Sequence, residues 1–281
     1  MTMTQEMNKA LVENLKRFNA KERDHLMRYA YLGRSANYTE DKVFLNNDFD
    51  RALRNLAGLG EDAHCVFAGM DYHLDWLFAA LWMSTNHPDW EPDLGDSPRV
   101  PMAPHESVEG VDDLYTDLRP VTGSQEDIDL LVIYKVANTL ALLFVEAKGS
   151  AAFDRVQLAR KLIRLDRILV DSGVAKNCEN SLPYLLVLAS PNKPNFLDVK
   201  DRKKELDCLQ FAEQLPKPSA DDKQDKFKAM REALKDHKSE IGKGLNYLPI
   251  CGYPKPLYAV KRVGADAAAE EKYTHWTLEK R

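Results

Sequence analysis

The chain has 281 residues, of which 44% are hydrophobic and 30% charged, and this composition is typical of a globular protein with one large or two small domains. It contains no apolar run near the roughly 20 residues of a membrane span, no secretion signal and no CxxC pair among its four cysteines, so we expect a cytoplasmic protein without a membrane partner. Because the net charge of −5 gives no general attraction to nucleic acid, such a partner would have to meet a local basic patch.

The first part of the chain is predicted to be helical. Apolar residues recur at helical spacing within 5–32. Residues 46–58 begin with a capping Asn or Asp and end at a glycine, which is typical of a further helix. Residues 61–83 are apolar almost all round, so we expect a long buried helix there.

The middle of the chain predicts an α/β arrangement. Residues 84–124 are rich in Pro, Asp, Gly and Ser and indicate a long connection. Two apolar runs at 128–135 and 140–148 predict strands, and an amphipathic helix follows at 152–171. A further core strand is predicted at 183–189.

The last third of the chain has weaker signals. Residues 191–204 resemble a loop, in which Lys193 is a weak candidate for a phosphate contact. Residues 220–240 predict a charged surface helix, and 257–263 and 273–280 predict two final strands.

The two middle strands predict a β-hairpin with charges at its open end. A turn centred on 137–138, where an Asn favours turn geometry, places Lys135 opposite Leu140. Because pairing sums stay constant along an antiparallel ladder, Asp129 should then face Glu146 directly. Two like charges opposed at about 5 Å destabilise a sheet, so this pair calls for a ligand or a counter-ion.

A divalent cation between the two carboxylates would remove that repulsion. Lys148 should share the face of Glu146, because alternate residues of a strand point the same way. Mg²⁺ suits such a place, since it takes one or two carboxylates and keeps waters and substrate phosphates. Asp127 is the less favoured ligand because it lies at the loop edge. The alternative is a solvated hairpin end without a site, since the triplet (D/E)xK occurs six more times in the chain.

Three sequence blocks resemble the PD-(D/E)xK nuclease superfamily. They are Asp129-Leu-Leu-Val, then Leu-Phe-Val-Glu146-Ala-Lys148-Gly, then Gln157 in the next helix. The proline of the motif is missing, because Ile128 precedes Asp129. By this resemblance Asp129, Glu146 and Lys148 form the catalytic motif, the two acids bind the metal, and Gln157 is a supporting or substrate-contacting residue.

The resemblance, which covers about 61–190, implies a restriction-endonuclease-like fold with a mixed central sheet flanked by helices. We expect residues 1–60 to be a helical extension packed on this core and 191–281 to complete the same domain. The implied activity is Mg²⁺- or Mn²⁺-dependent hydrolysis of phosphodiester bonds, and DNA is favoured over RNA as the expected substrate. The alternative is a catalytically inactive module of this fold that binds nucleic acid or a protein, and a homodimer is compatible with either.

The helix after the hairpin has a basic face. When it is wound at about 100° per residue, one arc of about 120° carries four cations and no anion. These would meet phosphates beside the site, although a plain amphipathic surface helix is the common alternative. The polar residues of this arc are Gln157, Arg160, Lys161, Arg164 and Arg167.

The predicted long buried helix carries a polar stripe. The same winding places His64, Asp71 and Asp75 within an arc of about 40°. Two aspartates four residues apart repel each other, so they need a partner. Either arginines such as Arg51 or Arg54 pair with them, or the stripe borders the metal site. The resembled family often has an acidic residue on a helix before the hairpin, which makes Asp71 and Asp75 further candidates for metal binding.

Overall fold

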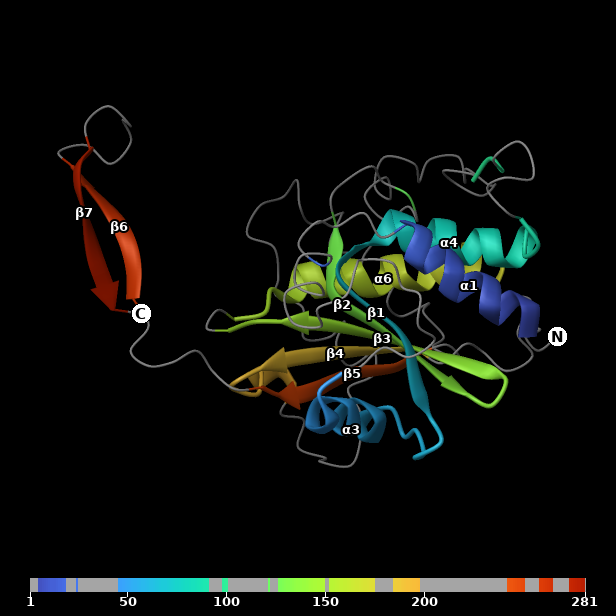
Figure 1. The fold of residues 1–281 in the computed structure, drawn as a ribbon. Coiled ribbons are helices and arrows are strands. Elements are labelled where there is room, and N and C mark those ends of the chain that lie inside the picture. The colour runs from blue at the N-terminus through green and yellow to red at the C-terminus, as the bar shows by residue number, and fades with distance from the viewer. Residues whose placement is uncertain are drawn as a thin grey trace.

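In the computed structural model, five strands form one mixed sheet with helices on both faces (Figure 1). This arrangement confirms the predicted α/β class and its mixed sheet flanked by helices. The structure describes residues 5–18, 24, 45–90, 98–100, 121, 126–149, 152–174, 184–197, 242–250, 258–264 and 273–280, and helices and strands are counted within these ranges.

The sheet has the strand order β1-β2-β3-β4-β5. The first three strands, β1 (His64–His73), β2 (Asp127–Val136) and β3 (Thr139–Ala147), are antiparallel neighbours. The next two, β4 (Tyr184–Ser190) and β5 (Gly242–Pro249), continue the sheet parallel to β3. Every residue of β4 is buried, as expected for a parallel strand covered on both faces.

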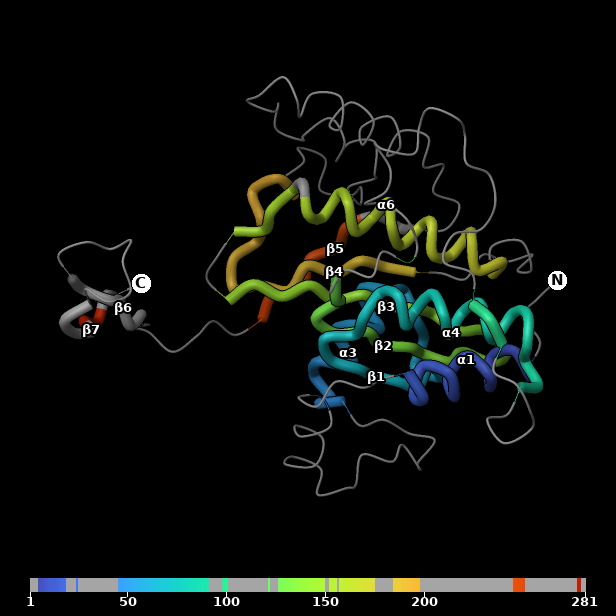
Figure 2. Tube along the Cα trace, turned by 90° about the horizontal axis from the view of Figure 1, so that it is seen from above, coloured from blue at the N-terminus to red at the C-terminus, as the bar shows by residue number. Residues whose placement is uncertain are grey.

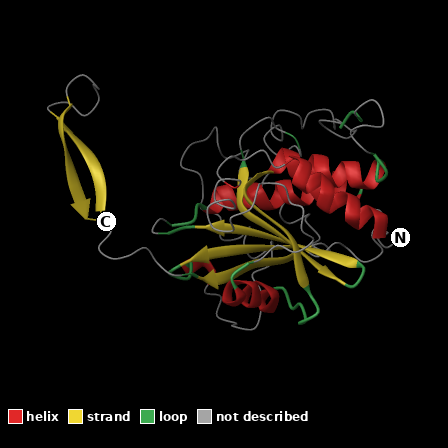
Figure 3. Ribbon diagram, viewed as in Figure 1, coloured by secondary structure: helices red, strands yellow, loops and turns green. Residues whose placement is uncertain are grey.

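Three helices cover one face of the sheet and one covers the other (Figure 3). The first face carries α1 (Gln5–Phe18), α4 (Leu74–Asn86) and α6 (Arg155–Asp171), which lie over the sheet in the view from above (Figure 2). The second face carries α3 (Asn47–Leu56). Within the described residues, no helix is long and apolar enough to cross a membrane.

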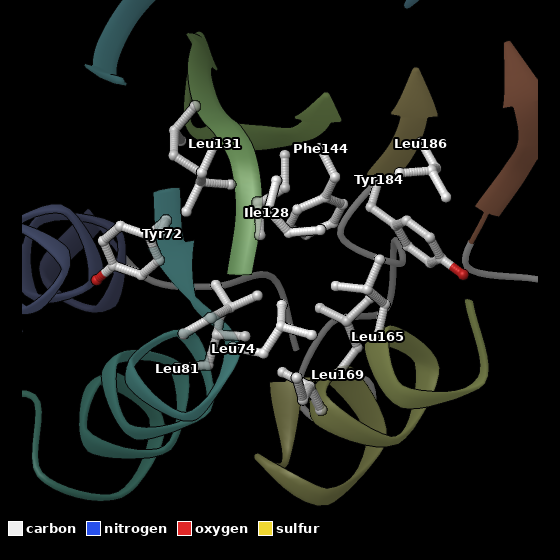
Figure 4. Close-up of a cluster of buried hydrophobic side chains, with 14 of the residues drawn as sticks. Tyr72, Leu74, Leu81, Ile128, Leu131, Phe144, Leu165, Leu169, Tyr184 and Leu186 are labelled. Carbon is white, nitrogen blue, oxygen red and sulfur yellow. The ribbon is translucent and has the colours of Figure 1, made fainter. Parts of the chain in front are cut away.

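Alternating side chains of β3 divide between two hydrophobic cores. Leu142 and Phe144 pack on the side of α4 and α6, whereas Leu143 and Val145 pack on the side of α3. Figure 4 shows the first core, in which Phe144 and Ile128 of the sheet lie opposite leucines of α4 and α6. The same alternation directs Glu146 to the side of α6, which positions the candidate site.

The predicted buried helix at 61–83 is wrong in its first half. Residues 64–73 form β1, and the helix α4 begins only at Leu74, after His73, whose Nδ1 accepts a hydrogen bond from the backbone of Asp75 (3.2 Å). The strand has a buried run, and a strand covered on both faces has the same continuous apolar pattern as a buried helix.

The C-terminal part contributes one strand to the main sheet. The strand β5 was missing from the sequence prediction, whereas β6 (Tyr258–Gly264) and β7 (Tyr273–Lys280) confirm the two predicted final strands. These last two pair only with each other and form a separate two-stranded sheet. The charged helix predicted at 220–240 lies outside the described residues, as does most of the connection predicted at 84–124.

The hairpin between β2 and β3 turns at the predicted position. Ala137 adopts a left-handed conformation there (φ 50°), while Asn138 accepts a hydrogen bond at its carbonyl from Asn8 of α1 (2.6 Å). A non-glycine residue at positive φ costs about 1 kcal/mol.

Replacing Ala137 with glycine should therefore raise the free energy of unfolding by up to about 1 kcal/mol. Urea unfolding followed by circular dichroism measures this change. The matched control is Ala141→Gly in β3, where glycine should destabilise because the strand requires extended backbone. Equal destabilisation by both variants would contradict the assignment of the turn.

Candidate metal and nucleic-acid site

Asp129 lies where β2 leaves β3. The predicted register is confirmed from the hairpin turn to the pair Leu130–Val145, but the ladder ends there, one pair short of Asp129 and Glu146. Asp129 Oδ2 instead accepts a hydrogen bond from the backbone N–H of Ala147 (2.7 Å). The Asp129 carboxylate thus replaces a backbone carbonyl as the acceptor for Ala147, and this hydrogen bond holds it beside the last residues of β3.

Glu146 is the buried acid of the site, with only 4% of its surface exposed. The ammonium group of Lys161, on α6, forms an ion pair with its Oε1 and also donates to the carbonyl of Asp127 (2.7 Å). Burial raises the pKa of the Glu146 carboxyl above its ordinary value, while the charge of Lys161 opposes this rise. Lys161 therefore provides the counter-ion that a buried carboxylate requires.

The charges of the motif act on each other across this strand end. The negative charge of Asp129 adds to the rise in the pKa of Glu146, and the positive charge of Lys148 acts in the opposite direction. Lys148 is half-buried, and its backbone N–H donates to the carbonyl of Ala189 in β4 (2.9 Å). The three motif residues are thus brought together at one end of the sheet.

Gln157 lies in the first turn of α6 with its side chain exposed. Its backbone N–H donates to Asp154 Oδ1 (3.3 Å) at the start of the helix. Its side chain forms no hydrogen bond with the described residues. No contact among the described residues supports the role expected for the Gln157 side chain, and this role stays a prediction.

Two carboxylate oxygens at the site can accept a ligand. No described residue donates a hydrogen bond to Asp129 Oδ1 or Glu146 Oε2. No group of three or more His, Cys, Asp or Glu side chains in the described ranges could hold a metal ion. Two carboxylates are nevertheless enough for Mg²⁺, which completes its shell with water and phosphate. The donor set therefore fits a hard, oxygen-seeking cation and not zinc.

The basic face predicted for α6 is only partly at the surface. Arg160 and Arg167 are exposed, whereas Lys161 and Arg164 are buried and paired with carboxylates of the protein. The prediction that all four meet phosphates is therefore corrected for the two buried cations. A helical wheel gives the relative direction of side chains but not what the rest of the chain places opposite them.

Arg164 is the centre of a second buried ion-pair cluster. Its guanidinium is fully buried (0% exposed) and pairs with Asp75 in the first turn of α4 and with Glu126 before β2 (2.8 Å). This cluster connects α6, α4 and the start of β2. Sequence reasoning missed Glu126, whose only signal was its place next to Asp127 at the head of an apolar strand.

The polar stripe expected on one helix does not exist as a stripe. His64 and Asp71 lie on β1, where Asp71 has a positive φ of 49°, and Asp75 lies on α4. Arg51 and Arg54, the expected arginine partners, pair with acids of their own helix α3. Asp75 does have an arginine partner, but this partner is Arg164 on α6, so Asp75 takes part in an ion pair that joins α4 to α6.

No family model, curated protein or solved structure matches this chain. The chemistry of the site is that of a pair of carboxylates and two lysines at the shared end of two strands, with one carboxylate buried.

Proposed function

We propose that the protein is a Mg²⁺- or Mn²⁺-dependent nuclease with a restriction-endonuclease-like core, acting on DNA. The observation that carries this proposal is the meeting of Asp129, Glu146 and Lys148 where β2 and β3 separate. Burying Glu146 beside a second carboxylate costs free energy, which Lys161 partly offsets, and a cation bound between the two carboxylates would remove the remaining repulsion.

Each residue of the motif has a distinct task in this proposal. Asp129 and Glu146 would hold the metal ion, which would lower the pKa of a bound water and neutralise charge on the phosphate. Lys148 orients the attacking water with its ammonium group and stabilises the charge that develops on the phosphate oxygens. Arg160 and Arg167, exposed on α6, contact neighbouring phosphates of the strand.

Lys161 gives the site a charge-balanced state without metal. Its ammonium group compensates Glu146 in the buried environment, so the fold does not depend on a bound ion. A metal ion would use Oε2 of Glu146, to which no described residue donates, while Lys161 keeps its ion pair with Oε1.

Cleavage assays with Mn²⁺ test the proposed reaction. Supercoiled plasmid, single-stranded DNA and RNA are incubated with the wild type, Glu146→Gln, Lys148→Met and the control Lys9→Met, which changes an exposed lysine of α1. We expect the first two variants to lose at least about 100-fold in rate. Lys9→Met should cut like the wild type. No cleavage of any substrate by the wild type, with no heat of metal binding, would contradict the proposal.

The Lys161–Glu146 pair also favours a second function, a catalytically inactive module that binds nucleic acid. In that case the lysine permanently occupies the place of the metal. Calorimetry separates the two functions, because the inactive module binds DNA without binding Mn²⁺. Retention of DNA binding in Glu146→Gln, with cleavage absent in the wild type, would favour this second function.

A further inference from the structure

A cleft of about 650 Å³ opens beside Lys148. It lies between the end of β3, the start of α6 a few residues later in the chain, and the distant loop after β4, which contains the 3-10 helix Asn195–Leu197. The nuclease proposed above uses only Lys148 of its wall. The described wall residues that bear on a ligand's chemistry are Lys148, Phe153, Arg155, Lys193 and Phe196.

The wall contains three cationic side chains. Lys148, Arg155 and Lys193 come from the three segments, and the described lining contains no carboxylate. The whole chain has a net charge of −5, so such a concentration of cations is local. Convergent cations in an otherwise acidic protein favour an anionic ligand, and phosphates supply most of the affinity for nucleic acid.

The apolar part of the wall provides flat surfaces. Phe196 is half-buried, so part of its ring is accessible, whereas Phe153 is buried under the cleft. Pro191 and Pro194 lie in the same loop. Cations that follow a backbone, together with an accessible aromatic ring on which a base can stack, are the combination found in proteins that bind single strands.

The size of the cleft selects between single and double strands. A volume of about 650 Å³ is that of a small-molecule site, with room for about one or two nucleotides. A base in this cleft must be unpaired to reach Phe196. Lys193 is exposed, so a duplex could also contact it.

We propose that this cleft binds one or two unpaired nucleotides of a nucleic-acid strand. Lys148, Arg155 and Lys193 contact the phosphates, and a base stacks on Phe196. The proposal rests on the proposed function only in that it names the substrate of that nuclease as a single strand or a frayed end. Because Lys148 belongs to both the cleft and the motif, the bound strand enters the site directly.

Binding in the presence of EDTA tests the cleft without any reaction. Fluorescence anisotropy compares a labelled oligothymidylate, an oligouridylate and a duplex, each of about 15 nucleotides or base pairs. We expect the full-length wild type to bind single strands at least about tenfold more tightly than the duplex. The deoxy- and ribo-oligonucleotides decide which sugar the cleft prefers.

Variants locate the binding in the cleft. Arg155→Ala and Lys193→Ala should each weaken single-strand binding and lower the slope of log affinity against log salt by about 1. Phe196→Ala should weaken it by about tenfold, while Phe196→Tyr keeps the ring and should retain it. Lys9→Ala, an exposed lysine outside the cleft, is the matched control and should leave affinity and slope unchanged.

The outcomes for binding and for cleavage are separable. Duplex binding as tight as single-strand binding, or wild-type affinity in the Arg155 and Lys193 variants, overturns the cleft proposal even if DNA is cut. Single-strand binding that depends on Arg155, Lys193 and Phe196 supports the cleft proposal even if no substrate is cut. In that case only the proposed nuclease activity is contradicted.

Discussion

Replacing Arg164 with alanine is expected to lower the free energy of unfolding by about 3–5 kcal/mol. The guanidinium is fully buried, and its removal leaves the carboxylates of Asp75 and Glu126 near each other without their shared cation. These two carboxylates come from α4 and from the segment before β2, so their repulsion acts on the packing that holds the site in place. The change also leaves a cavity under α6.

Urea unfolding followed by circular dichroism measures this loss. Arg167→Ala is the matched control, because it removes the same side chain from the exposed surface of the same helix. We expect that control to change the free energy of unfolding by less than about 0.5 kcal/mol. A similar small effect for both arginines would show that Arg164 is not the centre of a buried cluster.

Replacing Lys161 with alanine should produce a loss of stability that depends on pH. Burial raises the pKa of Glu146, and Lys161 opposes that rise, so the variant raises this pKa further. A carboxyl whose pKa is raised by folding favours the folded state at low pH, where it is protonated in both states. This contribution is lost as pH rises through the folded pKa. We expect the deficit of the variant to be small near pH 5 and to reach about 3 kcal/mol at pH 8.

Unfolding experiments across this pH range test the Lys161 prediction. The double variant Lys161→Ala/Glu146→Gln is the control, because without the titrating acid the deficit should no longer grow with pH. Mn²⁺ adds a test of the metal site that does not need catalysis: at pH 8 it should restore stability to Lys161→Ala, since a cation then replaces the lysine. A deficit that is constant from pH 5 to 8 contradicts the assigned role of the ion pair.

The part of the site that could be predicted is the part that is local in sequence. The turn at 137–138 and the alternation on either side of it give the register of β2 and β3, and the register places Asp129 and Glu146 at one strand end. The following helix has a clear helical period, so α6 was also predictable. These elements need no knowledge of distant segments.

The rest depends on what lies opposite each element in space. Residues 64–73 have the uniform apolar pattern that a buried strand shares with a buried helix, and only the neighbouring strand β2 decides between them. Likewise β5 pairs with β4 across about 50 intervening residues, so no local turn signalled it. Lys161 and Arg164 looked like surface cations because the acids that pair with them lie on other elements.

The parallel strands β3, β4 and β5 give the sheet one edge at which loops could be exchanged. All three strands end at the same edge of the sheet. The backbone N–H of Ile250 donates to the carbonyl of Ser190 (3.2 Å), so a hydrogen bond fixes the ends of β4 and β5 to each other. Loops grafted after Ser190 would therefore lie beside Lys148, whose backbone N–H bonds to Ala189 of β4, without disturbing the strand ladders. The sheet acts as a fixed frame, and new specificities can be sought by exchanging segments along this one edge.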